Sequence, residues 1–576
     1  MNSKELRRKF LDFFEKRGHI IVPSSSLLPT DPSVLFTTAG MQQFKEYFLG
    51  KESPYGPKIT SCQKCFRTSD IEEIGNQKHL TFVEMLGNFS FGEYFKEEAI
   101  KLAYEFLFEE LKLSKDEAFF TIFEGDKNVP EDKESILIWK KLGIKEDKIK
   151  RRGREDNFWG PTGEEGPCGP ATEIHFGDVE VWNLVFNEYY QDRDQKLTLL
   201  KQKGVDTGMG LERLAMIVQG KNSVFETDLF EPILKDLNCF AIKKIKDLRD
   251  KELNKKAVRI IADHIKSSVF LISEGILPSN VERGYVLRRL LRRIIRYGKL
   301  LNLPKNFSIS LAQKVIEIYK FIYPEVKSKE TDILTVIQNE EEKFEKTLEK
   351  GLKQFEKISA KRAISGTDAF HLYDTYGFPL ELTIELAKER NLKVDEKGFQ
   401  KAFQKHQEIS RAGVESKFGG VGEEATYEAT KLHTATHLLH SALRQILGVQ
   451  ARQMGSDITS QRLRFDFSHP QKMTKPQLRK VEDLVNQKIK ENLLVKKEEM
   501  GYTDAVRSRA LAFFKEKYPE RVTVYSIGTP EQVFSKEICA GPHVKRTSEL
   551  GHFKIIKEES SGSGVRRIRA ILKNAD

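Results

Sequence analysis

Three residues could together hold a nucleotide. Arg67 ends one predicted strand, Phe82 begins the next, and His79 lies in the loop between them. Residues 68–79 between these strands are too many for a tight turn and too polar to bury. A fixed arginine, a loop histidine and an aromatic ring can hold two phosphates and a purine. The segment therefore predicts a nucleotide site under a closing loop, and an ordinary hairpin with an exposed arginine is the competing interpretation.

A glycine-rich segment, residues 204–210, runs into an apolar helix and favours the nucleotide site. Glycines let a ligand approach the backbone closely. Arg213 lies on the first turn of the helix, where it can stack on a base or reach a terminal phosphate. Either segment alone is weak evidence, but together they predict a phosphate-binding pocket.

A second chemical centre is predicted in the last third of the chain. His433 and His437 are one helical turn apart, so both imidazoles can face one ion, and Cys539 and His543 follow about a hundred residues later. Either pair alone is typical of ordinary polar packing. The four side chains together are ligands suited to Zn²⁺. Cys62 and Cys65 have no second pair at finger spacing, and we interpret them as strand residues.

The motifs resemble those of class II aminoacyl-tRNA synthetases. Arg67 with Phe82 and Glu84 is similar to motif 2, residues 208–213 to motif 3, and residues 35–41 to motif 1. The segments MLGNFSFGEYF, GPCGPATEI, PSNVERGYVLRR and LYDTYGFP are similar to the alanyl-tRNA synthetase family in particular. The resemblance extends from residue 1 nearly to the end of the chain.

The resemblance implies that ATP and L-alanine react to give alanyl-adenylate and that the alanyl group then passes to tRNA(Ala). Mg²⁺ is expected with ATP. For ATP we expect Arg67 at the α-phosphate, Phe82 on the adenine, and His79 and Arg213 at the outer phosphates. Glu84 holds either the adenine amino group or magnesium, and the sequence leaves both open.

The alanine pocket needs a counter-charge for an ammonium group and a tight apolar wall for a methyl group. Asp206 is the carboxylate best placed for the ammonium, because it precedes the glycines of the nucleotide strand. The resemblance adds the remaining residues of the pocket: Met41, Trp159, Asn183, Val185 and Gly208. Simple core burial is the competing interpretation for Trp159 and Val185.

Residues 286–299 concentrate arginines on one face of a predicted helix and apolar residues on the other. Because this face has few acidic neighbours in the sequence, we predict that Arg288, Arg292 and Arg293 contact tRNA phosphates. A face that is exposed only to solvent is the competing interpretation. The resemblance implies that Asn280 and Asp374 read the G3·U70 wobble pair of the acceptor stem. Turn or helix-cap roles are the competing interpretation for both.

The resemblance also implies an editing domain. A methyl-sized pocket cannot exclude glycine, and serine adds only a hydroxyl, so binding discriminates by about 1–3 kcal/mol. A separate hydrolytic site would therefore remove serine and glycine from tRNA(Ala). Gln453 is expected to be a polar partner there, and His440 a residue behind the metal ligands. The family's glycine and threonine in the C-x-x-x-H motif are replaced by Ala540 and Pro542, which places editing, though not zinc binding, in question.

We predict an α+β multidomain fold, since 576 residues exceed one core. Its parts are a class II antiparallel-sheet catalytic domain (1–240), a helical tRNA-recognition domain (241–412), a glycine-rich linker (413–428) and an α/β zinc-containing editing domain (429–576). Compared with the family pattern, we expect the β-barrel insert and the C-terminal domain to be absent. We therefore identify a shortened member of the family and expect a monomer.

Composition sets the remaining expectations. The net charge of +11 favours a polyanionic partner. Five cysteines without an apolar leader predict a cytoplasmic location, and no apolar stretch is long enough to suggest a membrane span. Two other functions stay open: a tRNA-binding deacylase with a vestigial synthetase half, and an RNA-binding regulator without enzymatic activity.

Overall fold

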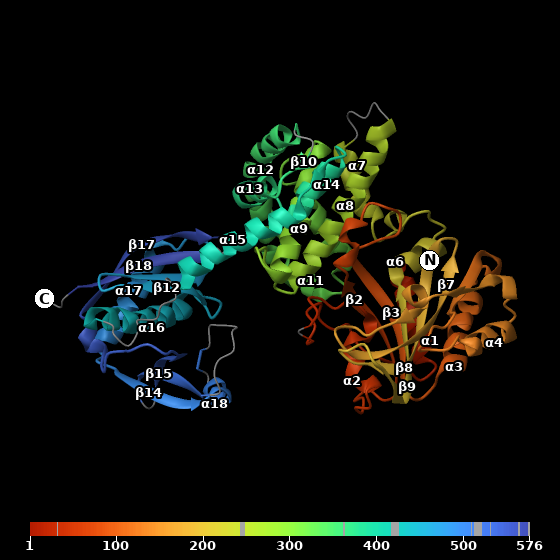
Figure 1. Ribbon diagram of the computed structural model, residues 1–576, viewed down its shortest axis with the longest axis horizontal. Helices are drawn as coiled ribbons and strands as arrows, with labels where there is room; N and C mark the ends of the chain where they lie inside the picture. The colour runs from red at the N-terminus through yellow and green to blue at the C-terminus, as the bar shows by residue number, and fades with distance from the viewer. Residues whose placement is uncertain are drawn as a thin grey trace. The chain divides into compact units, whose positions relative to one another are not determined.

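The computed structural model describes the chain except residues 32, 242–247, 361–362, 416–425, 470, 509, 512–520, 530–531, 563–564 and 574–576. The chain divides into two compact units, Met1–Asp395 and Glu396–Asp576 (Figure 1). Most of the predicted linker lies outside the described residues. Its predicted start, residue 413, falls within α15 (Glu396–Glu415), a helix of the second unit. The division into three domains stays a prediction.

A nine-stranded sheet forms the base of the first unit, in the order β1-β2-β3-β9-β8-β7-β4-β5 with β6 beside β7. The pairs from β2 to β4 are antiparallel, and only the outer pairs β1·β2 and β4·β5 are parallel. This arrangement confirms the predicted antiparallel sheet. The strands are β1 (Ile20–Ile21), β2 (Lys58–Phe66), β3 (Phe82–Phe91), β4 (Ala118–Phe123), β5 (Ile149–Arg152), β6 (Phe158–Trp159), β7 (Gly166–Phe176), β8 (Val179–Gln191) and β9 (Leu197–Gly210).

Helix α1 (Ser3–Glu15) covers part of this sheet. A capping box of Asn2 and Glu5 fixes its start. Its apolar face packs on the sheet through aromatic contacts, with ring centroids of Phe10 and Trp182 5.8 Å apart. The other helices near the sheet are α2 (Lys45–Phe48), α3 (Lys96–Tyr104), α4 (Lys133–Lys141), α5 (Arg154–Asn157) and α6 (Leu211–Val218).

The rest of the first unit is helical, as predicted. One continuous apolar core joins it to the sheet, from Leu6 in α1 to Ile337 in α12. A short parallel strand pair, β10 (Ala363–Ile364) and β11 (Lys393–Val394), closes the unit. The helices are α7 (Glu231–Ala241), α8 (Leu248–Ser273), α9 (Glu282–Leu300), α10 (Phe307–Tyr319), α11 (Pro324–Ser328), α12 (Glu330–Ser359), α13 (Gly366–Tyr376) and α14 (Leu380–Lys388).

The second unit contains two antiparallel sheets and its own apolar core, which confirms the predicted α/β character of this region. The sheets are ordered β12-β13-β18-β17 and β14-β15-β16. Within the described ranges of both units, no helix combines the length and apolar character needed to cross a membrane. After α15 the elements are α16 (Tyr427–Leu447), β12 (Gln453–Ile458), β13 (Leu463–Ser468), α17 (Lys475–Lys490), β14 (Leu494–Gly501), α18 (Tyr502–Arg507), β15 (Arg521–Gly528), β16 (Val533–Ile538), β17 (His552–Gly562) and β18 (Val565–Lys573).

Candidate functional site

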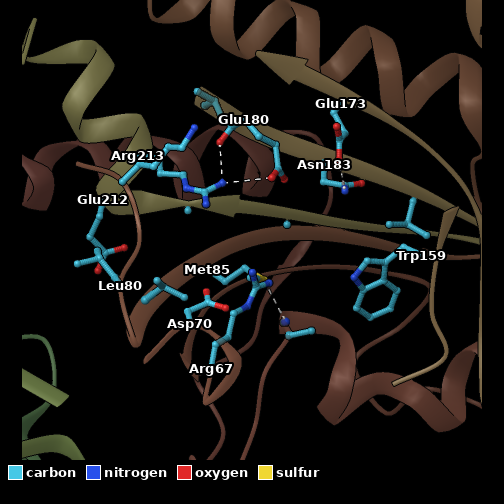
Figure 2. A pocket seen from close by; sticks show the side chains of 18 of the residues that line it. Arg67, Asp70, Leu80, Met85, Trp159, Glu173, Glu180, Asn183, Glu212 and Arg213 are labelled. Atoms are coloured by element: carbon cyan, nitrogen blue, oxygen red, sulfur yellow. Dashed lines mark hydrogen bonds and ion pairs between the residues drawn. The ribbon is translucent and has the colours of Figure 1, made fainter. Parts of the chain in front are cut away.

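A cavity of about 240 Å³ opens on the face of the large sheet (Figure 2). Strands β3, β8 and β9, the loop after β2 and the start of α6 contribute its walls. It collects residues that the sequence predicted for both ATP and alanine. They are Arg67, Trp159, Asn183, Val185, Asp206, Gly208 and Arg213.

Strand register explains why the predicted alanine residues meet. Asn183 pairs with Gly208 and Val185 with Asp206 across β8 and β9. Residues two apart on a strand project from the same face. The four positions therefore form one patch, although they come from segments more than twenty residues apart. The Asn183 amide is fixed in turn, because its Nδ2 donates to Glu173 Oε1 at 3.0 Å.

Asp206 is the buried carboxylate of this patch, with 5% of its surface exposed. Burial raises the pKa of Asp206 to about 7. A buried carboxylate is costly to ionise unless a cation stands beside it. The position therefore favours a ligand that brings a positive charge, such as an amino group.

The two predicted phosphate-binding arginines approach the cavity from different elements (Figure 2). Arg213 is held by Glu180, since its Nη1 donates to the backbone carbonyl at 3.0 Å and lies 3.2 Å from Oε2. Arg67 donates from Nε to the carbonyl of Thr38 at 3.2 Å. Both guanidinium groups are thus held by a neighbouring acceptor, and a guanidinium has five N–H donors, more than these contacts use, that can hold an oxyanion.

Phe82 and Glu84 lie on the opposite face of β3 from the cavity. Phe82 is fully buried and stacks on Phe270 with ring centroids 4.0 Å apart. Glu84 accepts hydrogen bonds from Arg7 at 2.9 and 2.7 Å. The structure contradicts their expected contacts with adenine or magnesium. Because side chains alternate along a strand, their neighbours Val83 and Met85 line the cavity instead.

Met41 and His79 lie close to the cavity without lining it. Met41 is fully buried, with its sulfur 3.7 Å from Thr162 Oγ1, so it supports the wall from behind. His79 Nδ1 is 2.6 Å from Asn76 Nδ2. Burial lowers the pKa of His79, and the nearby positive charge of Arg213 lowers it further, so the ring is neutral near pH 7.

The cavity also contains charged residues that sequence reasoning did not assign: Asp70, Lys78, Asp156, Glu173, Glu180 and Glu212. Lys78 and Glu212 are sequence neighbours of the predicted His79 and Arg213, so adjacency could have indicated them. Glu180 had no local signal, because only the fold brings it to Arg213. Glu212 is paired with the ammonium of Lys266 at 2.6 Å, and both side chains are buried.

The arginine face of α9 is not exposed, which corrects the predicted phosphate contacts of Arg288, Arg292 and Arg293. All three are less than 10% exposed. Arg288 and Arg292 lie 3.5 and 2.8 Å from Glu340 of α12, and Arg293 lies 2.9 Å from Glu385 of α14. The acidic partners are distant in sequence, so a count of neighbours along the chain could not reveal them.

Two of these arginines instead contact the segments that carry the predicted base-reading residues. Asn280 is exposed, and its side-chain oxygen accepts a hydrogen bond from Arg288. Asp374 is exposed on α13, and Arg292 donates to the carbonyl of Gly377 where that helix ends. Both residues are therefore exposed, and α9 contacts Asn280 itself and the end of the helix that carries Asp374.

The four predicted metal ligands meet in the second unit. The ligand atoms of His433, His437, Cys539 and His543 all lie within 4.8 Å of one another. Cys539 Sγ is 3.3 Å from His433 Nε2. Helix α16 supplies two histidines one turn apart, and the segment after β16 supplies the other two side chains. A spacing of this size fits one four-coordinate cation.

The hydrogen bonds around the cluster direct ring nitrogens toward its centre. His433 Nδ1 lies 3.1 Å from the carbonyl of Pro542, and His543 Nδ1 lies 3.1 Å from Thr434 Oγ1. The buried Nε2 of His543 has no hydrogen-bond partner among the described residues. Burial, together with the nearby His437, lowers the pKa of His433 to about 4, so its imidazole is neutral, as a metal requires.

His440 lies behind the cluster, as predicted. Its Nδ1 is 2.9 Å from Glu537 Oε1, while Glu537 Oε2 is 3.6 Å from Nδ1 of His437. Gln453 begins β12 and donates to Ser456 Oγ at 3.1 Å. In the part of the chain that the structure describes, no hydrogen bond links Gln453 to the cluster.

Comparisons with known proteins agree with this geometry. Residues 5–460 match the family model described as tRNA synthetases class II (A), and residues 522–569 match the threonyl and alanyl tRNA synthetase second additional domain. The alanine–tRNA ligase of Borrelia hermsii is 48% identical over 99% of this chain and 100% of its own length.

Two further relatives are also alanine–tRNA ligases. That of Treponema pallidum is 46% identical, covering 100% of this chain and 99% of the relative. That of Thermotoga maritima is 39% identical over 99% of this chain and 80% of the relative. By its matching models, its relatives and its two assembled sites, the chain belongs to the alanyl-tRNA synthetase family of class II.

Proposed function

We propose that this chain activates alanine with ATP and transfers it to tRNA(Ala). One observation carries the proposal: the buried carboxylate Asp206 lies in a small cavity that is flanked by the anchored arginines Arg67 and Arg213. The carboxylate matches an ammonium group, and the arginines match phosphates. Val185, Gly208 and Trp159 line the same cavity and supply apolar surface for a methyl group.

In this pocket the alanine carboxylate attacks the α-phosphorus of ATP, and pyrophosphate leaves. Arg67 would stabilise charge on the α-phosphate, and Arg213 with His79 the leaving phosphates. Mg²⁺ bound to ATP neutralises phosphate charge. The protein needs no nucleophilic side chain, because holding the two substrates in line supplies most of the rate increase.

For the tRNA we propose that Asn280 and Asp374 read the G3·U70 pair. An exposed amide and an exposed carboxylate can match the donors and acceptors of a wobble pair. The buried arginines Arg288 and Arg292 hold their positions and do not contact phosphates. We further propose that the chain is a monomer.

For the second site we propose that His433, His437, Cys539 and His543 hold Zn²⁺ and that this unit hydrolyses Ser- and Gly-tRNA(Ala). The metal would orient the aminoacyl ester or activate a water molecule. Gln453 is proposed to contact the substrate and not the metal. We place the protein in the cytoplasm, which is supported by the free thiols of Cys62, Cys65, Cys168 and Cys539.

The first test is alanine charging of an acceptor-stem RNA with G3·U70 compared with the same RNA carrying G3·C70. Charging of the G3·U70 RNA alone is the expected result. If neither RNA is charged and alanine-dependent pyrophosphate exchange is absent, the synthetase function is wrong. Hydrolysis of Ser-tRNA would then indicate a deacylase, and RNA binding without hydrolysis would indicate a regulator.

A further inference from the structure

Two arginines of α9 each connect α14 with residues 68–80, the loop between β2 and β3 that covers the cavity. Arg289 pairs with Glu72 of the loop, and its Nη1 lies 3.6 Å from Glu381 of α14. Arg293, one turn later, donates from Nη1 to the carbonyl of Ile71 at 2.8 Å and lies 2.9 Å from Glu385. Arg289 and Arg293 are four residues apart on α9, and their partners Glu381 and Glu385 are four residues apart on α14. The two connections therefore lie one helical turn apart on both helices.

The contacts of Arg293 continue to the base of the same loop. Its Nη1 is 2.8 Å from His264 Nε2, and His264 Nδ1 is 2.8 Å from Asp263 Oδ2. Asp263 accepts hydrogen bonds from the Thr81 backbone N–H at 2.9 Å and from its hydroxyl at 2.6 Å. The carbonyl of Thr81 in turn accepts from the backbone N–H of the cavity residue Arg67 at 2.8 Å.

The part of this network around Arg293 is buried, which makes its geometry stiff, whereas Glu72 at its edge is half-exposed. The side chains of Asp263 and His264 are fully buried, and Arg293 is 2% exposed. A buried charge that loses its partner is strongly unfavourable, so the groups shift together or not at all. A displacement of α14 is therefore passed to residues 71, 72 and 81, at the loop's middle and base.

The other end of the network lies beside the proposed base-reading helix. Helix α14 follows α13, which carries Asp374, after the short connection 377–379. Arg292 donates to the carbonyl of Gly377 in that connection. One helix, α9, thus contacts the end of α13, the side of α14 and the loop over the activation cavity.

We propose that Arg289 and Arg293 are positioning residues that couple docking of the acceptor stem at α13 and α14 to closure of residues 68–80 over the cavity. The inference rests on the proposed function. Coupling between two binding events is reciprocal, so an occupied cavity must also tighten binding of the RNA. This tightening can be measured without turnover.

The decisive variant is Glu72→Gln, which removes the loop partner of Arg289. Glu72 has a half-exposed side chain, so the substitution leaves folding intact. Glu389→Gln is a matched control, because Glu389, which directly follows α14, pairs with Arg296 of α9. No contact joins Arg296 to the loop among the described residues.

The measurement is the Kd of the G3·U70 acceptor-stem RNA with and without a sulfamoyl analogue of alanyl-adenylate. In the unaltered chain and in Glu389→Gln we expect the analogue to tighten RNA binding about fivefold. In Glu72→Gln we expect the effect to fall below about twofold, with unchanged binding of the analogue itself.

Three outcomes would overturn the inference. Equal tightening in Glu72→Gln and the control would show that the loop contact transmits nothing. Equal loss in both variants would show a general weakening of the α9 and α14 packing. Absence of tightening in the unaltered chain would remove the coupling itself. If the unaltered chain also lacks alanine-dependent pyrophosphate exchange, the proposed function is wrong, and the inference that rests on it is wrong too.

Discussion

Single residues in both sites owe their chemistry to burial. Asp206 is a carboxylate whose pKa is raised to about 7 by desolvation alone. His433 is an imidazole whose pKa is lowered to about 4 by the same cause, aided by the charge of His437. Burial therefore prepares the first residue to receive a cation and keeps the second neutral for metal binding.

The raised pKa of Asp206 predicts a pH dependence of alanine binding. The free pocket is protonated below about pH 7, whereas a bound ammonium group requires the carboxylate, so binding releases a proton. The KM for alanine in pyrophosphate exchange should rise as the pH falls through about 7, with little change above it. The KM for ATP should not follow this profile.

Asp206→Asn is the matched variant for this prediction. Loss of the charge partner should raise the KM for alanine by about 100-fold, because an unpaired buried charge costs about 2–5 kcal/mol. Its remaining alanine KM should lose the pH dependence near pH 7, since the carboxylate that pairs with the alanine ammonium group is gone. A variant that keeps the original pH profile would remove Asp206 from the alanine site.

Glu537 is predicted to strengthen the proposed zinc site without binding the metal. Its carboxylate lies 2.9 Å from His440 Nδ1 and 3.6 Å from His437 Nδ1. Glu537→Gln should weaken zinc binding by about 10- to 100-fold, as for other outer carboxylates. Competition with a chromophoric chelator measures this change, and Glu559→Gln on β17 is the control. Equal zinc affinity in the two variants would contradict the role.

At the scale of elements, α9 shows how a helix with a strongly basic face can be internal. Its apolar side packs in the core, and its arginine side is neutralised by carboxylates of α12 and α14. Such pairs stabilise only when both partners are present, because each alone would be a buried charge. The helix therefore fixes the relative placement of α12, α13 and α14.

Arg292→Met tests this structural role of α9. It leaves Glu340 buried without its closest partner and should lower the free energy of unfolding by about 3 kcal/mol. The double variant Arg292→Met, Glu340→Leu should recover most of that loss in urea unfolding. The salt dependence of RNA binding should stay unchanged. If the slope of log K for RNA binding against log salt concentration fell by about one, Arg292 would be shown to contact a phosphate.

At the scale of the whole molecule, the two units carry separate cores and separate sites. The apolar core around the large sheet contains residues between 6 and 337, and the core around α16 contains residues between 432 and 570. The alanine cavity lies in the first unit, and the metal ligands lie in the second. Each unit therefore has what it needs to fold and bind independently.

Fragments 1–395 and 396–576 should each fold on their own. The first should keep alanine-dependent pyrophosphate exchange within about threefold of the full chain, since its core and cavity are complete. The second should unfold cooperatively on heating, and its Tm should rise when zinc is added, because a ligand bound only to the native state stabilises that state. A fragment without cooperative unfolding would show that the units depend on each other.

The sequence by itself determined the family, the kinds of elements and the residues of both sites that lie in short motifs. Arg67, Asp206, Arg213 and the four metal ligands come together as their spacing and resemblance predicted. Local spacing fixes which side chains share a strand face or a helix turn, and the resemblance links motifs that are far apart in the chain. The roles of these residues in binding stay predictions.

Only the tertiary structure decided which charged and aromatic groups are available to a ligand. Phe82 and Glu84 belong to motif 2 in the sequence, yet the face of β3 that they occupy is packed against Phe270 and Arg7. The arginines of α9 meet carboxylates about 50 to 90 residues away. Because pairing of this kind depends on which helices pack together, it cannot be inferred from the separation of residues along the chain.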